Sequence, residues 1–159
     1  MTRVCLVGSE DVNLRYELLS RETARDALAT YDLQEPFENT IALGTVSLGA
    51  AVSLLNDLNW YLVRFTDGTM VQEPSVSDSE WLSRSLAAAI RDDEIPAEER
   101  DRFLRVYGVE RPSEDDDEAL PRLVEPMLVT RTSETIPEYD LRDVDETLIV
   151  RLEKDEFGA

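Results

Sequence analysis

The segment Gly44-Thr-Val-Ser-Leu-Gly49 has two glycines separated by four residues, which is the spacing at the start of a phosphate-binding loop. In such loops the GxxxxG spacing is followed by lysine and by serine or threonine, which contact phosphate and magnesium. Ala50 and Ala51 occupy those two places, so nucleotide hydrolysis is not supported. A helix start can still bind an anion through its free N–H groups. Gly44, Thr45 and Ser47 are therefore candidate ligand-binding residues, and close packing of a core helix is the alternative interpretation.

A second polar cluster, Ser9, Glu10 and Asp11, directly follows the apolar run Arg3–Gly8. If that run is a parallel strand in an open sheet, its carboxyl end is where ligands bind. The carboxylates would repel phosphate but accept hydrogen bonds from a cationic or hydroxylated ligand, and paired carboxylates also serve acid–base chemistry. Arg64 is a candidate partner at the same edge. A turn or helix cap explains the same residue types equally simply.

The acidic run Ser113–Glu118 is the third place where chemistry is conceivable, because clustered carboxylates bind hard cations. A calcium loop, however, needs alternating oxygen ligands and a glycine at its sixth position, and this run has neither. Charge blocks of this kind are usually solvated. We therefore expect an acidic loop over residues 111–121, with no metal site and no cofactor.

Cysteine and histidine chemistry is almost entirely excluded by composition. The chain has no histidine, and its single cysteine, Cys5, lies in an apolar run where burial is expected. A zinc site of cysteine and histidine ligands and histidine-based catalysis are both ruled out. Whether the protein is an enzyme stays open, and a non-catalytic role is favoured.

The elements that position these residues centre on an uncharged stretch, Asn39–Asn56. It predicts a strand at Thr40–Leu43, the glycine turn, and a helix at Leu48–Leu58 that is apolar on nearly all sides. Trp60–Phe65 is apolar on both alternating faces, which is typical of a central strand. Asp67-Gly68 is then a hairpin turn signal, so Thr69–Gln72 is expected to pair back.

Helix signals lie on both sides of this centre. Residues 12–19 fit either a strand or a helix, and a helix is predicted over Arg21–Tyr31. Ser77 and Glu80 have capping-box spacing, which predicts a helix from Asp78 to Arg91. Another helix is expected to begin near Pro96 and to end at Gly108.

Two strands, Leu123–Thr130 and Thr147–Leu152, close the chain, and Pro126 makes the first an edge strand or a bulged one. The pattern predicts a single domain over residues 1–159. Its fold class is α/β or α+β, with one mixed sheet of about five or six strands and three or four packing helices.

The charge balance is unusual, because 35 acidic residues face 16 basic ones, giving a net charge of −19. So much like charge weakens a compact state in dilute buffer, whereas molar salt shortens the Debye length to about 3 Å and screens the repulsion. The composition is similar to that of cytoplasmic proteins of salt-accumulating archaea. No basic stretch is available to neutralise phosphates, so nucleic-acid binding is not expected.

Two segments, MTRVCLVGSEDVNLRYELLS and VSLGAAVSLLNDLNWYLVRF, resemble a family of small, acidic, uncharacterised haloarchaeal proteins. The resemblance covers most of the chain and implies a cytoplasmic, halophilic protein. It implies no activity, because the family has none assigned.

Two functions are therefore compared. The first is a protein-interaction or regulatory module that contacts an unidentified protein, or a second copy through an edge strand, with no membrane involved. Its candidate surface is Met70, Val71, Met127 and Val129, since edge strands invite pairing with another chain. The alternative is a small-ligand sensor or enzyme that uses carboxylates and arginines. A cavity with converging charged groups would favour the alternative.

Overall fold

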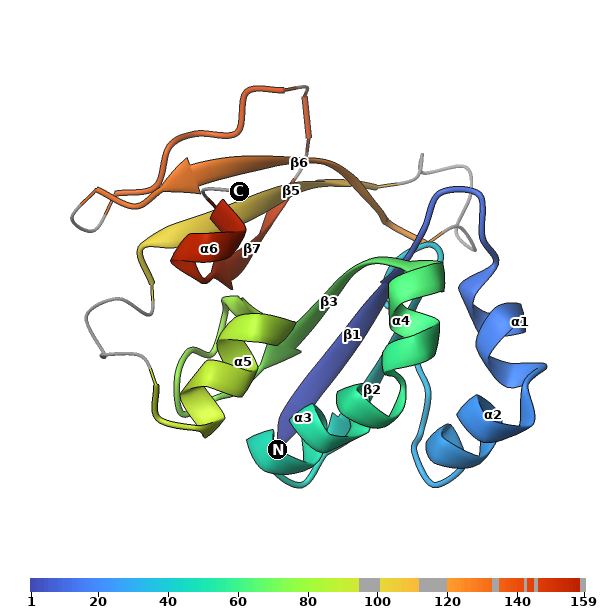
Figure 1. Ribbon diagram of the computed structural model, residues 1–159. Helices are drawn as coiled ribbons and strands as arrows, with labels where there is room; N and C mark the ends of the chain where they lie inside the picture. Colours follow the sequence, from blue (N-terminus) through green and yellow to red (C-terminus); the bar gives the residue numbers. More distant parts are fainter. Residues whose placement is uncertain (95–100, 112–119, 133–134, 142, 145, 158–159) are drawn as a thin grey trace.

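The computed structural model describes residues 1–94, 101–111, 120–132, 135–141, 143–144 and 146–157 (Figure 1). Its strands form one sheet in the order β2-β1-β3-β4-β7-β5-β6. The strands are β1 (Thr2–Gly8), β2 (Thr40–Thr45), β3 (Thr66–Gln72), β4 (Trp81–Ser83), β5 (Phe103–Glu110), β6 (Arg122–Thr130) and β7 (Glu146–Leu152). The helices are α1 (Leu14–Leu19), α2 (Glu22–Leu28), α3 (Leu48–Asp57), α4 (Asn59–Phe65), α5 (Arg84–Arg91) and α6 (Lys154–Phe157).

The sheet has two antiparallel halves, β2-β1-β3-β4 and β7-β5-β6. Among the strands of the described residues, the two halves are paired through β4 and β7, which are parallel, with Trp81 opposite Val150 and Leu82 opposite Arg151. In Figure 1, β5 and β6 run at a large angle to β1 and β3. The second half thus folds over one face of the first, while α1 to α5 cover the other face.

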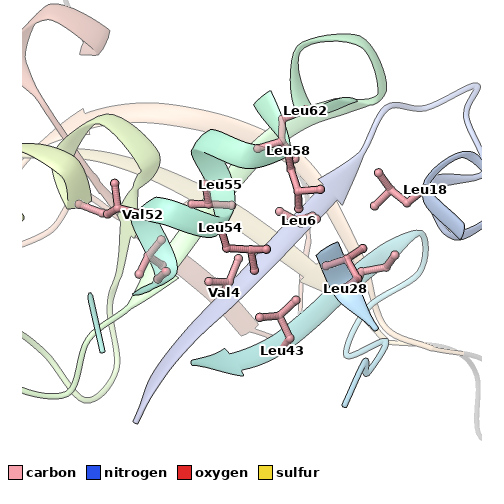
Figure 2. Close-up of a cluster of buried hydrophobic side chains, with 14 of the residues drawn as sticks. Val4, Leu6, Leu18, Leu28, Leu43, Val52, Leu54, Leu55, Leu58 and Leu62 are labelled. Atoms are coloured by element: carbon pink, nitrogen blue, oxygen red, sulfur yellow. The ribbon is translucent and has the colours of Figure 1, made fainter. Parts of the chain in front are cut away.

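The core on the helical face is built from alternate residues of the first half and from the apolar sides of the helices. Val4 and Leu6 of β1 and Leu43 of β2 point toward the helices, as Figure 2 shows. They meet a set of leucines, namely Leu18, Leu28, Leu54, Leu55, Leu58 and Leu62. Because side chains alternate along a strand, Cys5 of β1 faces the opposite way.

A second core lies between the two halves of the sheet. It is contributed by Cys5, Ala42, Met70 and Trp81 of the first half and by Tyr107, Val150 and Leu152 of the second. This apolar contact stabilises the folded-over arrangement, since burying apolar surface is the dominant favourable term in folding.

The prediction of a central strand at Trp60–Phe65 is wrong, because these residues form α4. Leu58, Tyr61, Leu62 and Phe65 recur at helical spacing and pack on the core. Trp60, which a central strand would bury, is 50% exposed. A segment that is apolar throughout satisfies both periodicities, so alternation alone could not distinguish them.

The predicted hairpin turn at Asp67-Gly68 is also wrong. Both residues lie within β3, and Gly68 does not have the positive φ that a type I′ turn requires. The strand pairs with β1 and β4 rather than with the preceding segment. Met70 and Val71 are consequently in an interior strand.

The capping interaction at Ser77 exists, but the helix that it was expected to start does not begin there. Ser77 Oγ accepts the N–H of Glu80 at 3.0 Å. The chain then enters β4, and α5 begins at Arg84 with Ser83 as its cap. Glu80 does not complete a capping box, because its carboxylate binds Arg131 and Arg151 instead.

The helix expected from Pro96 begins in residues 95–100, which lie outside the described part of the chain. The predicted C-terminal part of this helix is wrong, because Phe103–Glu110 forms the strand β5. Leu104 and Val106 alternate there with Arg105 and Tyr107, which is strand periodicity. Gly108 permits a close approach rather than ending a helix, since a Cβ atom on it would lie 2.7 Å from Val144.

Several predictions on the same chain are confirmed. The strands β1, β2, β6 and β7 and the helices α2 and α3 lie where the sequence placed them, and residues 14–19 are helical. Pro126 is in an edge strand, beside a register shift between β5 and β6. The mixed sheet is confirmed, but the seven strands and six helices found in the described ranges exceed the numbers expected. No described helix is long and apolar enough to cross a membrane.

Candidate functional site

A cavity of about 840 Å³ lies between the two halves of the sheet. One wall comes from the end of β1, the loop before β2 and the start of β3, and the other from β5 and β6. The charged residues that line it are Glu10, Glu38, Asp67, Arg105, Arg122 and Glu125. The fold thus gathers acidic and basic side chains from distant parts of the sequence around one polar cavity.

Asn39 fixes the first wall. It has a positive φ of 57°, which asparagine adopts more readily than most residues. Its Oδ1 accepts the N–H of Leu14 at 3.0 Å, and its Nδ2 donates to the carbonyl of Ser9 at 3.0 Å. Gly8 N–H donates to the Asn39 carbonyl at 2.9 Å. These bonds hold the loop that carries Glu10 to the rim of the cavity.

Tyr107 and Arg105 lie on the second wall, on the same face of β5. Tyr107 is only 7% exposed, and a Cβ atom on Gly68 would lie 3.0 Å from its hydroxyl oxygen. Burial raises the pKa of Tyr107 above its usual range, although the nearby Arg105 guanidinium opposes the shift. The phenol therefore keeps its proton at neutral pH.

The ionic contacts around the cavity are unevenly distributed. Arg122 donates to Glu110 at 3.0 Å. By contrast, no carboxylate of a described residue lies within 4.0 Å of the Arg105 guanidinium. Glu10, Glu38 and Asp67 likewise have no ion-pair partner in the described ranges. Glu10, Glu38, Asp67 and Arg105 thus line the cavity without an ion-pair partner among the described residues.

Of the sequence candidates beside β1, only Glu10 lines this cavity. Asp11 is exposed on the neighbouring turn, and Ser9 is used by the fold, since its N–H donates to Phe65. Arg64 lies on α4, where its guanidinium carbon is 3.9 Å from the centre of the Trp60 ring. The premise of a parallel first strand is wrong, because β1 is antiparallel to both neighbours.

The glycine turn lies at the opposite end of β2, away from the cavity. Thr45 Oγ1 donates to the carbonyl of Ser47 at 2.9 Å. Ser47 Oγ caps α3 by accepting the N–H of Ala50 at 3.1 Å. Gly44 faces the Met1 side chain, whose sulfur would be 2.8 Å from an added Cβ atom. The polar groups of this turn thus serve the local structure.

The candidate interaction residues are divided by the structure. Met70 and Val71 are 2% and 0% exposed in β3, so the expectation that they lie on an accessible hairpin is wrong. Met127 and Val129 are half-buried on the edge strand β6, and Leu128 between them is 50% exposed. Only the β6 pair remains accessible to a partner.

Sequence reasoning missed Glu38, Asp67, Arg105 and Tyr107. The alternation in Phe103–Glu110 was a signal for a strand with Arg105 and Tyr107 on one face. We predicted a helix there instead, because Pro96 is typical of a helix start and Gly108 of a helix end. No local pattern predicts that this face of β5 lies near Asp67, because their proximity depends on how one half of the sheet folds over the other.

The described side chains of the cavity offer ion pairing and hydrogen bonding to a ligand. The described residues contain no group of three or more side chains suited to holding a metal ion. Cys5 is buried, which raises the pKa of its thiol to about 12 and keeps it protonated. The groups that can form these interactions are carboxylates, the guanidinium groups of two arginines and the phenol of Tyr107.

Fold and cavity together define a mixed α/β domain with a polar, charged cavity inside a folded-over sheet. The chain belongs to DUF5804, a family of unknown function, whose model matches residues 2–109. The matched region includes Glu10, Glu38, Asp67, Arg105 and Tyr107 and ends before β6. No curated protein and no solved structure matches the chain.

Proposed function

We propose that this domain binds a small, positively charged ligand in the cavity between the halves of its sheet, without transforming it. The observation that carries the proposal is the set of carboxylates Glu10, Glu38 and Asp67, which line the cavity and lack ion-pair partners among the described residues. A volume of about 840 Å³ falls within the usual range of ligand pockets.

The electrostatics favour a cation. Four carboxylates and two arginines line the cavity, so negative charge is in excess there. A cation inside it would be attracted by several carboxylates at once, although these are exposed and each attraction is modest. The bonds around Asn39 pre-organise the acidic wall, which lowers the entropic cost of binding.

The absence of a catalytic set supports binding rather than turnover. The chain has no histidine, the usual general base near neutral pH. Raised pKa values keep both Cys5 and Tyr107 protonated there, so neither is an activated nucleophile or a base. A carrier, sensor or regulatory role requires none of these groups.

Calorimetric titration with agmatine, a small dication, tests the proposal in molar potassium chloride. We expect saturable binding to one site, weakened in Glu10→Gln and in Asp67→Asn. The matched control is Glu22→Gln, which removes the same charge from the exposed surface of α2. Equal binding by all variants would mean that agmatine associates with acidic surface rather than with the cavity.

The charge balance leads us to propose in addition that the protein works in the salt-rich cytoplasm of a halophilic cell. A net charge of −19 is compatible with a compact fold at molar salt, because the Debye length is then about 3 Å and repulsion between more distant charges is screened. Arginine in fifteen of sixteen basic positions suits that environment, because guanidinium is more weakly hydrated than ammonium.

The edge strand β6 supports a second candidate function, contact with another protein or with a second copy. The opposite edge strand, β2, is covered, because Gln34 and Ala42 exchange backbone hydrogen bonds of 2.8 and 2.7 Å. On β6, Leu128 is half-exposed between Met127 and Val129. Exposed edges of this kind template pairing with another chain.

Sedimentation velocity in molar salt tests this second function for a second copy. A dimer that dissociates in Leu128→Lys would support it. The control, Val63→Lys, adds the same charge at an exposed apolar position on α4. A monomer at every concentration, or a dimer that is unaffected by Leu128→Lys, would remove β6 as a self-association surface.

A further inference from the structure

We infer that the ligand also carries an anionic group, which the Arg105 guanidinium and the Tyr107 hydroxyl hold together. The ligand class is then a zwitterion with net positive charge, such as an amino acid with a basic side chain. This inference rests on the proposed function and specifies the chemistry of the same cavity.

The first observation is that Arg105 has no carboxylate partner. The chain holds 35 acidic residues, yet no described carboxylate lies within 4.0 Å of this guanidinium. The other arginine in the cavity, Arg122, is bound to Glu110. Arg105 is half-buried and lines the cavity, so its positive charge faces the space that a ligand would occupy.

The second observation is the hydrogen-bonding state of Tyr107. The Arg105 guanidinium and the Tyr107 hydroxyl both lie against Gly68, and a guanidinium has only donors, so Arg105 offers no acceptor to the phenol proton. The phenol proton has no acceptor among the described residues. Arg105 and Tyr107 therefore present N–H and O–H donors side by side from the same face of β5, the arrangement that binds an oxyanion.

The third observation is the opposite polarity of the cavity rim. Glu10 and Glu38 are exposed there, and Asp67 is exposed at the start of β3. An ammonium or guanidinium group on the same ligand would meet these carboxylates. The cavity is thus lined by groups of both charges, which match two opposite charges on one molecule.

The total charge distinguishes a carboxylate from a phosphate as the anionic group. Carboxylates outnumber arginines in the cavity, and the whole chain is strongly negative. A doubly charged phosphate would be repelled more strongly than a singly charged carboxylate. The class that fits is therefore an amino acid rather than a phosphorylated amine.

Two matched pairs of probes test the inference, L-arginine with agmatine and L-lysine with cadaverine. Within each pair the molecules differ only by the carboxylate. Because the amines carry the larger positive charge, attraction to an acidic protein alone ranks them above the amino acids. Holding of the carboxylate by Arg105 reverses that order, with a gain of about tenfold for a charge-assisted hydrogen bond.

The variants are Arg105→Gln and, as control, Arg122→Gln, titrated calorimetrically in molar potassium chloride. Both remove one positive charge from the cavity, but only the first removes the guanidinium without a carboxylate partner. We expect Arg105→Gln to abolish the preference for the amino acids while retaining amine binding. Arg122→Gln should keep the preference. Tyr107→Phe should reduce it, since the phenol proton is lost.

The outcomes separate this inference from the proposed function. If the amines bind in the cavity but the amino acids bind no more tightly, the zwitterion inference is wrong and the proposed function stands. A preference that persists in Arg105→Gln also overturns the inference. If none of the four probes binds, the proposed function itself loses its support.

Discussion

The hydroxyl oxygen of Tyr107 lies against the backbone of Gly68, where an added Cβ atom would be only 3.0 Å away. This contact brings β5 of one half of the sheet to β3 of the other, and Tyr107 and Asp67 beside it line the cavity. A side chain at position 68 would occupy the space that the phenol needs. The distance between the halves, and with it the width of the cavity, therefore depends on a glycine at this position.

We expect Gly68→Ala to destabilise the protein by about 1–2 kcal/mol, because the added methyl group forces Tyr107 to move in a packed contact. Gly49→Ala is the control, since only Ser47 Oγ, at 3.9 Å, approaches its added Cβ atom. That change should stabilise α3 by about 0.5 kcal/mol through lower chain entropy in the unfolded state. Urea unfolding monitored by circular dichroism measures both. Equal effects of the same sign would refute the close contact at Gly68.

A cluster of ionic contacts connects the two halves at the narrow β4–β7 junction. Glu80 receives Arg151 Nε at 2.7 Å and Arg131 Nη2 at 2.5 Å, and all three side chains are mostly buried. Burial raises the pKa of Glu80, but the hydrogen bonds and charges of the two arginines outweigh it, and the pKa lies below its ordinary value.

Glu80→Gln should therefore cost about 2–4 kcal/mol at neutral pH, because two arginines lose their shared counter-charge. Since the folded-state pKa is depressed, the stability from Glu80 is present above the unfolded-state pKa and is lost as pH falls through the folded value. Unfolding free energies measured from pH 7 down to pH 3 should converge for the two proteins. A constant difference over that range would show that protonation of Glu80 contributes nothing.

Cys5 should be unreactive in the folded protein and reactive only after unfolding. Burial raises the pKa of its thiol to about 12, so the nucleophilic thiolate is scarce at pH 8. Iodoacetamide labelling followed by mass spectrometry, with and without urea, measures this. Rapid labelling of the folded protein would place Cys5 at an accessible surface instead.

The same pKa shift has a consequence at high pH. Because the thiol keeps its proton in the folded state beyond its unfolded pKa near 9, Cys5 contributes stability that declines as pH rises from about 9 toward 12. Cys5→Ser, whose hydroxyl does not titrate there, should show a weaker decline over this window. An identical pH dependence of the two unfolding midpoints would contradict the assignment.

Salt should control the stability of the fold. With a net charge of −19, self-repulsion is expected to weaken folding sharply below about 0.5 M salt. Thermal melting followed by circular dichroism across a potassium chloride series tests this. A melting temperature at 50 mM equal to that at molar salt would contradict the proposed adaptation to a salt-rich cytoplasm.

Local patterns were sufficient where only one structure satisfied them. The apolar run at Arg3–Gly8 and the uncharged stretch that forms β2 and α3 predicted elements that the structure contains. Trp60–Phe65 satisfied two periodicities, and burial against the core decided for the helix. Phe103–Glu110 has the residue alternation of a strand, but Pro96 and Gly108 favoured a helix, and we predicted the helix.

The cavity could be predicted only through Glu10, because its other members depend on long-range geometry. Arg105 and Asp67 line the same cavity because a two-residue parallel junction lets one half of the sheet fold over the other. The residues adjacent to Arg105 or to Asp67 do not encode the angle between the two halves of the sheet. The burial of Met70 and Val71 has the same origin, since β1 and β4 flank β3 on both sides.

Amide chemical-shift mapping with agmatine, in molar potassium chloride, tests the central claim of a cation-binding cavity most directly. We predict saturable shifts confined to the two walls, at Gly8, Glu10, Asn39, Gly68 and Tyr107, and their loss in the Glu10→Gln, Asp67→Asn double variant. Shifts that are absent, or that spread over acidic positions remote from the cavity such as Glu22 and Asp26 of α2, would contradict it.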